Sequence, residues 1–542
     1  MVRSFSRRTL LHKSALTALA GFPMLSTVAH ALGAEADQAV DADVVLRGGT
    51  LVDGSGKEGF LGDVAIAGDR IVAVGRFRAG KVAQTIDCRG LVVAPGFIDL
   101  HTHCDRSITV PDKRNNRNYL MQGCTTVVTG NCGGGKLDTA KYFAEIEKHG
   151  AGTNVIHLIP QGSLRASVMG LANRRPTGDE MKRMRRRIDE NMRAGAWGMS
   201  TGLIYVPSVY ADTDELVELA KQVARHRGIY ASHIRGEEDR LLTAVAEAIE
   251  IGRRAGVPAH ISHFKANCVP NWGRLRDAAA LVDAARKSGQ SVTADQYPYI
   301  ACATSIYGIL LPVEKVPGGY RDLAKRIEAD PKLRRTVREL IVKQLDRTRK
   351  VLVTGCKIAR YRGRTLAQIA AAENKERADV VLEIIASGKA SAVNFSMSED
   401  DVRYAMKLPW VATASDGAGA LASPTGRGHP RSMGTFARKI GRYAIEEKVV
   451  SLAHAIRSAT GLPADILGLA DRGYLRPDYV ADVAVFDPAT YRDRATFEKP
   501  RVYATGVRYL YVAGHAAIDA GRPSEKLFGR ALRHPVSTKP AS

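Results

Sequence analysis

The sequence predicts a protein of the α/β class built around a (β/α)8 barrel. Eight short apolar runs alternate with segments of helical periodicity through the middle of the 542-residue chain. Stretches near both ends instead alternate apolar and polar residues between glycine turns, which is typical of antiparallel strands. We therefore expect a TIM-like barrel, a small β-sandwich domain assembled from both chain ends, and an inserted lid subdomain.

The barrel is expected over residues 95–464. Its predicted strands begin with "GFIDLHTH" and end with "WVATASDGA", and their spacing is regular except before the last one. About a hundred residues separate "DQYPY" from "WVATASDG", so we expect the seventh helix there and an insertion at roughly 303–390 that caps the barrel. The β-sandwich domain is expected to combine residues 40–94 with residues 465–525.

Residues 1–31 are predicted to be an export signal that forms no part of the fold. The paired arginines of "SRRTLLHK" precede a moderately apolar stretch, and Ala29-His30-Ala31 resembles a cleavage site. The pattern resembles a twin-arginine signal, so we expect export by the twin-arginine machinery to the periplasm or beyond. The stretch is too short and weakly apolar for a stable membrane span, although an uncleaved N-terminal anchor is the alternative.

The formal net charge of +23 favours anionic partners. The basic residues are scattered over helix-like segments such as "MKRMRRRIDENMR", and no nucleic-acid-binding motif is found. The charge is therefore better explained by a small anionic substrate or a negatively charged envelope than by nucleic acid. The seven cysteines lack C-x-x-C spacing, and their odd number leaves at least one thiol unpaired or otherwise employed.

Metal-ligating side chains gather at the carboxyl ends of the predicted strands, where barrel enzymes place their reacting groups. Residues two apart on a strand point the same way, so both imidazoles of "HTH" can reach one ion. Each of these residues alone is a weak signal, but together imidazole, thiolate and carboxylate suit Zn²⁺. The predicted ligands are His101, His103, Cys132, His233, His263 and Asp416.

Several motifs resemble those of the amidohydrolase superfamily and, more narrowly, of the D-aminoacylase (N-acyl-D-amino-acid deacylase) family. They are "APGFIDLHTHCD", "SHIRGE", "ISHFKA", "DQYPY", "SDG" and "HPRSMGTFARKIGRY", and the similarity runs from about residue 42 to 525. The resemblance implies a metal-bearing barrel, a β-sandwich from both chain ends, and an inserted lid. It also implies that Cys132 stands where other superfamily members carry a carboxylated lysine or a glutamate that bridges two metals.

The same resemblance divides the predicted ligands between two zinc positions. Cys132, His233 and His263 would hold the tighter ion, and His101, His103 and Asp416 would form a second, weaker position. Whether the active form needs one ion or both stays open.

The chemistry implied is hydrolysis of a linear amide in an N-acyl-D-amino acid or in a dipeptide with a D-residue. We hypothesise that zinc-activated hydroxide attacks the amide carbonyl, and that Asp416 accepts the water proton and passes it to the departing amine. The substrate carboxylate needs cations and hydrogen-bond donors, and a guanidinium suits it best. The candidates are Arg431 first, then Lys265, Tyr205, Arg165, Tyr297 and His429.

Two other functions remain alternatives. A cyclic amidase of the hydantoinase or dihydroorotase type would use the same barrel, and a lysine at position 132 would have favoured it. The second alternative is a non-catalytic binding protein whose barrel has lost its enzymatic activity. Loss of a metal-ligating residue would have favoured it, and none of the predicted metal ligands is lost.

Overall fold

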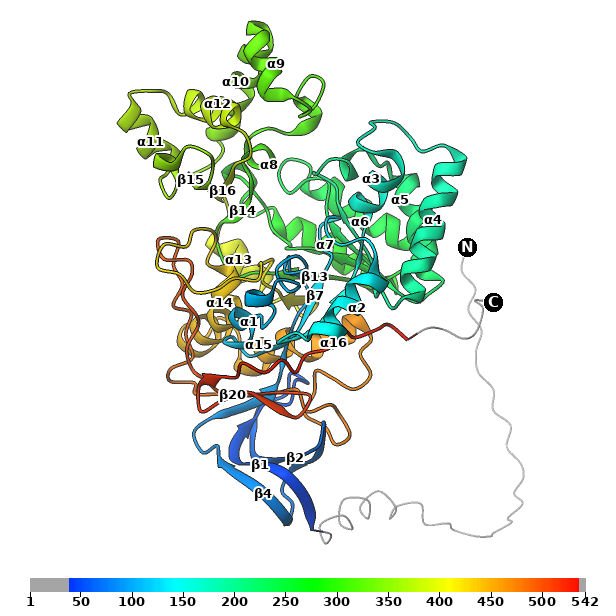
Figure 1. Ribbon diagram of the computed structural model, residues 1–542, viewed down its shortest axis with the longest axis vertical. Helices are drawn as coiled ribbons and strands as arrows, with labels where there is room; N and C mark the ends of the chain where they lie inside the picture. The colour runs from blue at the N-terminus through cyan, green and yellow to red at the C-terminus, as the bar shows by residue number, and fades with distance from the viewer. Residues whose placement is uncertain (1–38, 536–542) are drawn as a thin grey trace, which may run out of the picture.

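The computed structural model describes residues 39–535, and the predicted export signal at residues 1–31 lies outside that range. Figure 1 shows a β-rich domain at the bottom, the barrel in the middle and a separate subdomain above it. No helix among the described residues is long and apolar enough to cross a membrane.

The β-rich domain is a nine-stranded sheet in which both chain ends take part. β5 and β18 join the two ends as an antiparallel pair. β1 pairs with β2 along one edge and with both β4 and β5 along the other. The strands are β1 (Val40–Leu51), β2 (Phe60–Ala67), β3 (Arg70–Gly75), β4 (Ala79–Asp87), β5 (Val92–Pro95), β18 (Val483–Phe486), β19 (Val507–Val512), β20 (His515–Asp519) and β21 (Arg522–Pro523).

Each of the eight predicted apolar runs contains a parallel strand of the barrel, which confirms the predicted fold class. The barrel closes where the last strand meets the first, because Asp416 N donates to His101 O over 2.8 Å and His103 N donates to Gly417 O over 2.7 Å. Leu158 interrupts the third predicted strand. The strands are β6 (Phe97–Asp99), β7 (Cys124–Thr129), β8 (Asn154–His157) with β9 (Ile159–Pro160), β10 (Gly198–Gly202), β11 (Ile229–His233), β12 (Ala259–Ile261), β13 (Val292–Gln296) and β17 (Val411–Thr413).

Local signals explain where the outer helices begin and end. Thr177 and Glu180 form a capping box at the start of α4, and Asp212 caps α5. Gly256 ends α6 with a φ of 65°, a conformation that glycine adopts without strain. The helices are α1 (Arg117–Leu120), α2 (Thr139–His149), α3 (Gln161–Met169), α4 (Gly178–Arg193), α5 (Thr213–Ala224), α6 (Leu241–Ala255), α7 (Leu275–Lys287), α13 (Glu399–Ala405), α14 (Arg431–Ala437), which continues as a π-helix over Arg438–Glu446, α15 (Leu452–Ala459) and α16 (Gly461–Leu467).

The inserted subdomain stands above the barrel in Figure 1 and has an apolar core of its own, which includes Val337, Ile341 and Ile385. Its three strands form an antiparallel sheet in the order β14-β16-β15. The elements are β14 (Cys302–Ser305), α8 (Ile306–Leu310), α9 (Leu323–Ala329), α10 (Pro331–Leu345), β15 (Lys350–Gly355), α11 (Leu366–Glu373), α12 (Arg377–Ser387) and β16 (Ser391–Phe395).

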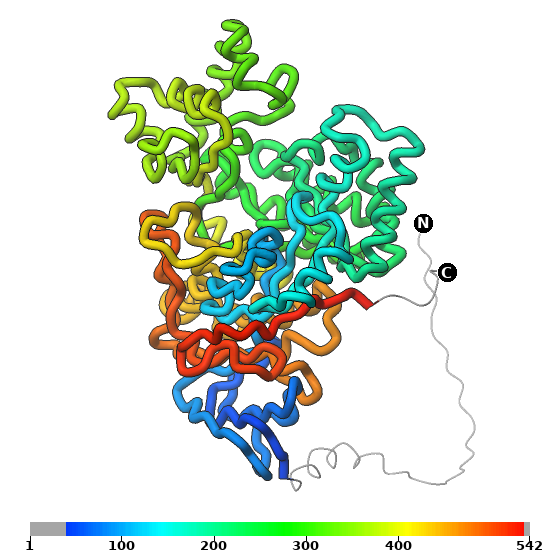
Figure 2. Tube along the Cα trace, viewed as in Figure 1, coloured from blue at the N-terminus to red at the C-terminus, as the bar shows by residue number. Residues whose placement is uncertain are grey.

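The chain beyond β21 returns along the barrel, as the red end of the tube in Figure 2 shows. Gly529 and Ala531 form isolated β-bridges with Ala151 and Val155. The indole of Trp197 donates to Leu532 O over 2.6 Å. The C-terminal segment is thereby attached to barrel residues next to β8 and β10.

Candidate metal centre

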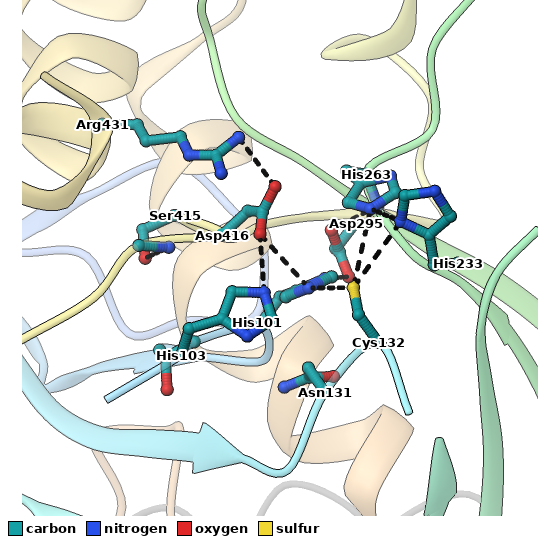
Figure 3. Close-up of polar contacts among 12 residues, drawn as sticks. His101, His103, Asn131, Cys132, His233, His263, Asp295, Ser415, Asp416 and Arg431 are labelled. Atoms are coloured by element: carbon teal, nitrogen blue, oxygen red, sulfur yellow. Dashed lines mark hydrogen bonds and ion pairs between the residues drawn. The ribbon is translucent and has the colours of Figure 1, made fainter. Parts of the chain in front are cut away.

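The carboxyl ends of β7, β11 and β12 bring a thiol and two imidazoles together (Figure 3). Cys132 Sγ lies 3.7 Å from His233 Nδ1 and 3.8 Å from His263 Nε2. The two imidazole nitrogens are 2.8 Å apart. These three donor atoms therefore face a common point inside the barrel mouth.

A second set of donors adjoins the first. Asp416 Oδ1 lies 3.0 Å from His103 Nε2 and 3.5 Å from His101 Nε2, and His101 Nε2 lies 3.3 Å from Cys132 Sγ. Thiol, imidazole and carboxylate donors recur in three overlapping groups, each with its ligand atoms within 4.8 Å of one another. This donor set fits a divalent metal ion, or two adjacent ones.

Three of the six residues have a left-handed backbone just beyond their strands. The φ angle is 52° at Cys132, 37° at His263 and 48° at Asp416. Such conformations cost on the order of 1–3 kcal/mol each and concentrate at functional sites. Gly202 provides the space that this arrangement needs, because a Cβ there would lie 2.2 Å from Cys132 O.

Asp295, at the end region of β13, orients three of the surrounding residues. Its Oδ2 lies 3.2 Å from His101 Nδ1 and 3.0 Å from His260 Nε2, and its Oδ1 accepts a hydrogen bond of 2.7 Å from His263 N. A carboxylate behind an imidazole fixes the tautomer and ring orientation of a metal ligand. Asp295 was not among the predicted site residues, although it belongs to the "DQYPY" motif.

Glu237 and Lys265 form a buried ion pair behind His263. The Lys265 Nζ and the Glu237 Oε1 each lie 2.8 Å from His263 Nδ1. Glu237 was also missed from the sequence, although it belongs to the "SHIRGE" motif. The pair places charged groups against the imidazole edge that faces away from Cys132.

The electrostatics favour metal-binding ionisation states at three of the six residues, Cys132, Asp416 and His233. Burial by itself raises the pKa of the Cys132 thiol, but His101 and the neighbouring imidazoles hold that pKa well below its ordinary value. Burial likewise opposes ionisation of Asp416, yet Arg431 and His101 keep its pKa well below the usual range. Burial and the charge of His263 lower the pKa of His233, which favours the neutral imidazole. At His101, His103 and His263 burial opposes protonation, but the Cys132 thiolate and nearby carboxylates raise the imidazole pKa.

Comparisons with known proteins identify the family of this chain. A model of the amidohydrolase family matches residues 84–329 and 342–517. A D-aminoacylase of Alcaligenes xylosoxydans xylosoxydans is 36% identical over 496 residues, which cover 87% of this chain and 93% of that protein. An N-acyl-D-glutamate deacylase of the same organism is 34% identical over 517 residues, covering 91% and 97%. The chain belongs to the amidohydrolase family, in its D-aminoacylase branch.

Solved structures agree with this assignment. A crystal structure of D-aminoacylase matches this amidohydrolase with a TM-score of 0.79 and 34% identity, covering 91% of this chain and 100% of that one. An N-acyl-D-glutamate deacylase from Bordetella bronchiseptica, complexed with zinc and a phosphonate inhibitor, matches with a TM-score of 0.78 and 32% sequence identity. The match again covers 91% of this chain and 100% of that one. A D-hydantoinase, with a TM-score of 0.54 and 14% sequence identity, shares the fold alone. The family comparisons support a divalent metal in the cluster.

A cavity of about 630 Å³ opens over the cluster of this amidohydrolase, and four of the predicted substrate-binding residues line it. The Arg431 Nη1 lies 2.7 Å from Asp416 Oδ2, and the Tyr205 hydroxyl lies 3.1 Å from Thr304 Oγ1. The buried Tyr297 hydroxyl has no hydrogen-bond partner among the described residues. The four are Tyr205, Lys265, Tyr297 and Arg431.

The structure does not bring Arg165 or His429 to the cavity lining. Arg165 is fully buried, because its guanidinium pairs with Glu215 over 3.0 Å and donates to the Ala172 carbonyl. His429 donates from Nε2 to Ala301 O and accepts from Arg431 N, over 2.8 Å and 3.0 Å. Arg165 therefore stabilises the fold. His429 positions Arg431, the first residue of α14, through the hydrogen bond from Arg431 N.

Proposed function

We propose that this protein is a zinc-dependent hydrolase that releases D-amino acids from N-acyl-D-amino acids. The observation that carries the proposal is the cluster of Cys132, His233 and His263 beside an Asp416 held by Arg431, all within one cavity. D-Aminoacylase and two acidic N-acyl-D-amino-acid deacylases, at 31–36% identity, support this substrate class. The cyclic-amidase alternative has weaker support, because the hydantoinase structures are only 13–15% identical.

We assign the tighter zinc position to Cys132, His233 and His263, and a weaker one to His101, His103 and Asp416. The cysteine-containing set is the softer of the two, and thiolate binds zinc well. When bound, the ion supplies Lewis-acid polarisation of the amide carbonyl and a hydroxide nucleophile at neutral pH.

Asp416 is placed to move the proton in this reaction. Arg431 and the imidazoles keep it ionised, so it accepts a proton from the attacking water and then donates it to the departing amine nitrogen. Arg431 also holds one carboxylate oxygen in place, which leaves Oδ1 facing His101 and His103. A single carboxylate thereby acts first as the base and then as the acid.

The substrate carboxylate is expected between Arg431, Lys265 and Tyr297. The first two supply positive charge from buried positions, and the unpartnered Tyr297 hydroxyl supplies a hydrogen bond. Charge-assisted hydrogen bonds in a buried site bind a carboxylate strongly and in a fixed orientation. These contacts hold the amino-acid half of the substrate against the metal cluster.

The proposal is tested with the zinc-loaded chain lacking residues 1–31 and a panel of N-acetyl-D-leucine, N-acetyl-L-leucine, a dipeptide with a C-terminal D-residue, and hydantoin. We expect hydrolysis of the N-acetyl-D substrate and bound zinc of at least one ion per chain by elemental analysis. Hydrolysis of hydantoin alone would overturn the assignment. Preference for the dipeptide would keep the chemistry and shift the substrate to peptides.

We also propose export by the twin-arginine route, which rests on the sequence of residues 1–31. Replacing Arg7 and Arg8 by lysine should retain the protein in the cytoplasm of the producing bacterium, whereas the unaltered chain reaches the periplasm. Equal periplasmic yields of the two forms would remove this proposal.

A further inference from the structure

The two sides of the catalytic cavity differ in chemistry. The carboxylate-binding candidates Lys265, Tyr297 and Arg431 follow β12, β13 and β17. The facing side follows β7, β9 and β10, which lie across the barrel in strand order. Outside the metal cluster, the lining residues that follow these three strands carry no charge and include Ala166, Leu171, Ile204, Val206 and Pro207. Asp105 and Arg106, which follow β6, also line the cavity, and Asp105 adjoins this side at Gly135.

This uncharged side is suited to the acyl half of the substrate. The scissile amide must lie at the metal cluster, and the carboxylate occupies the charged side, so the acyl group extends toward the opposite wall. A cavity of about 630 Å³ lies well within the 300–1,000 Å³ typical of sites for drug-sized ligands. An acetyl group would leave much of that volume unfilled.

Leu171 lies where this wall ends, in the loop after α3, and its side chain is 63% exposed. Leu171 and Val206 line the catalytic cavity and also a second cavity of about 1730 Å³. The second cavity lies between barrel residues 209–213 and residues 316–321 of the inserted subdomain. The two cavities are therefore neighbours that share an apolar wall.

The charged groups that line the second cavity leave its apolar wall available. Arg235 pairs with Glu247 over 2.9 Å, and Asp212 pairs with Arg175 over 2.6 Å. Valines 209, 313 and 316 continue the apolar lining beyond Val206. Arg240, Glu314 and Arg321, which also line the cavity, are exposed to solvent.

We propose that the acyl group of the substrate is a long aliphatic chain that passes over Leu171 and Val206 into the second cavity. This inference rests on the proposed deacylase function and adds the class of acyl group to it. The supporting observation is that Leu171 and Val206 line both cavities, so an alkyl chain leaving the metal cluster can cross from one cavity to the other along apolar side chains. The shared wall of Leu171 and Val206 presents carbon atoms, which favours an alkyl chain over a peptide.

The test is a series of N-acyl-D-leucines with acetyl, butanoyl, hexanoyl and octanoyl groups. Complete burial of one methylene raises a specificity constant by about four-fold. Because burial along an open cavity is partial, we expect kcat/KM to rise roughly ten-fold or more from acetyl to octanoyl. A flat or falling series in the unaltered enzyme overturns the inference, as does a larger gain from a dipeptidyl group than from octanoyl.

Leu171→Asn should flatten the rise, measured as the ratio of kcat/KM for the octanoyl substrate to kcat/KM for the acetyl substrate in the same variant, so that any effect common to both substrates cancels. Leu171→Ala should give an intermediate slope. The matched control is Leu61→Asn on β2, which alters a leucine that is 73% exposed and remote from both cavities, and it should keep the full slope. An unchanged slope in Leu171→Asn contradicts the proposal.

The acetyl substrate separates this inference from the function on which it rests. Hydrolysis of the acetyl compound with no gain for longer chains overturns only the long-chain proposal. Absence of hydrolysis at every chain length, in protein with bound zinc, overturns the deacylase function itself.

Discussion

The two halves of the metal cluster, Cys132 with His233 and His263, and His101 with His103 and Asp416, differ mainly at His103, because Cys132 is itself half-buried and His101 is fully buried. His233 and His263 are 5% and 3% exposed, whereas the His103 side chain is 34% exposed beside the cavity. Asp416, in the more open half, is shared between two imidazoles and the Arg431 guanidinium. The exposure of His103 agrees with the proposal that Cys132, His233 and His263 hold the tighter ion and that the other half faces the substrate.

Cys132→Ala removes the thiol that approaches imidazoles of both halves, so it should have the largest effect. We expect bound zinc to fall to a small fraction of its original stoichiometry and hydrolysis to fall by roughly a thousand-fold or more. Elemental analysis and initial rates measure both quantities. Cys356→Ala, in the inserted subdomain and 7% exposed, is the matched control and should keep its zinc. Stoichiometric zinc in Cys132→Ala would show that Cys132 is not a zinc ligand.

Asp416→Asn tests whether the open half carries the chemistry. The substitution keeps the side-chain shape but removes the basic oxygen, so kcat should fall by about 10²–10⁴-fold. The tighter zinc and the melting temperature should change little, because Cys132, His233 and His263 remain. Activity within ten-fold of the unaltered enzyme would remove Asp416 from proton transfer.

Asp295→Asn tests how the two halves are joined, because Asp295 bonds His101 and also the backbone of His263. Loss of such an orienting carboxylate costs about 10–100-fold in metal affinity or activity. A zinc titration of the metal-free protein, followed by rate measurements, separates the two. Asp283→Asn provides a control, since Asp283 accepts a hydrogen bond from the Trp410 indole and does not line the cavity. An Asp295→Asn variant with unaltered affinity and rate would show that the halves are independent.

Lys439 tests stability instead of activity, and its buried charge has no ion-pair partner among the described residues, in contrast to the paired charges of the cluster. It is 2% exposed in the π-helix, its Nζ donates to Met406 O over 3.3 Å, and burial lowers its pKa from 10.5 to about 7. Between these two values the unfolded chain binds a proton that the folded chain lacks, so stability should rise with pH from 7 to 10. Lys439→Met should remove this slope and raise the free energy of unfolding at pH 7 by about 3–5 kcal/mol. Melting curves from pH 6 to 10 measure it, and an unchanged slope would contradict the assignment.

The barrel could be predicted because the local sequence of each unit identifies its strand. Each strand is a short apolar run followed by turn residues and a segment of helical periodicity. The clustering of the donor residues could be predicted for the same reason. His101 and His103 share a side of one strand, and the other donors directly follow strands whose ends meet at one edge of the barrel. The β-rich domain, formed by both chain ends, could be predicted because apolar and polar residues alternate along its strands.

The supporting residues were not predictable in this way. Asp295 and Glu237 were present in the quoted motifs, but nothing in their local pattern distinguishes a carboxylate behind an imidazole from one in solvent. For Arg165 the prediction was wrong. A cation just beyond a strand could bind the substrate carboxylate, but the guanidinium of Arg165 already pairs with Glu215 and donates to two backbone carbonyls. The pairs Asp295–His263, Arg165–Glu215 and His101–Asp295 are separated by 32, 50 and 194 residues, so only tertiary contacts reveal them.

The amino-acid sequence by itself determined the barrel, the shared β-domain and the donor set, because strand periodicity and strand-end position are local properties of the chain. Tertiary structure decided which donors approach one another, which charges are already paired, and how the inserted subdomain completes a second cavity beside Leu171. Those features depend on distances between segments far apart in sequence, which the packing of the whole barrel and its insertion determines.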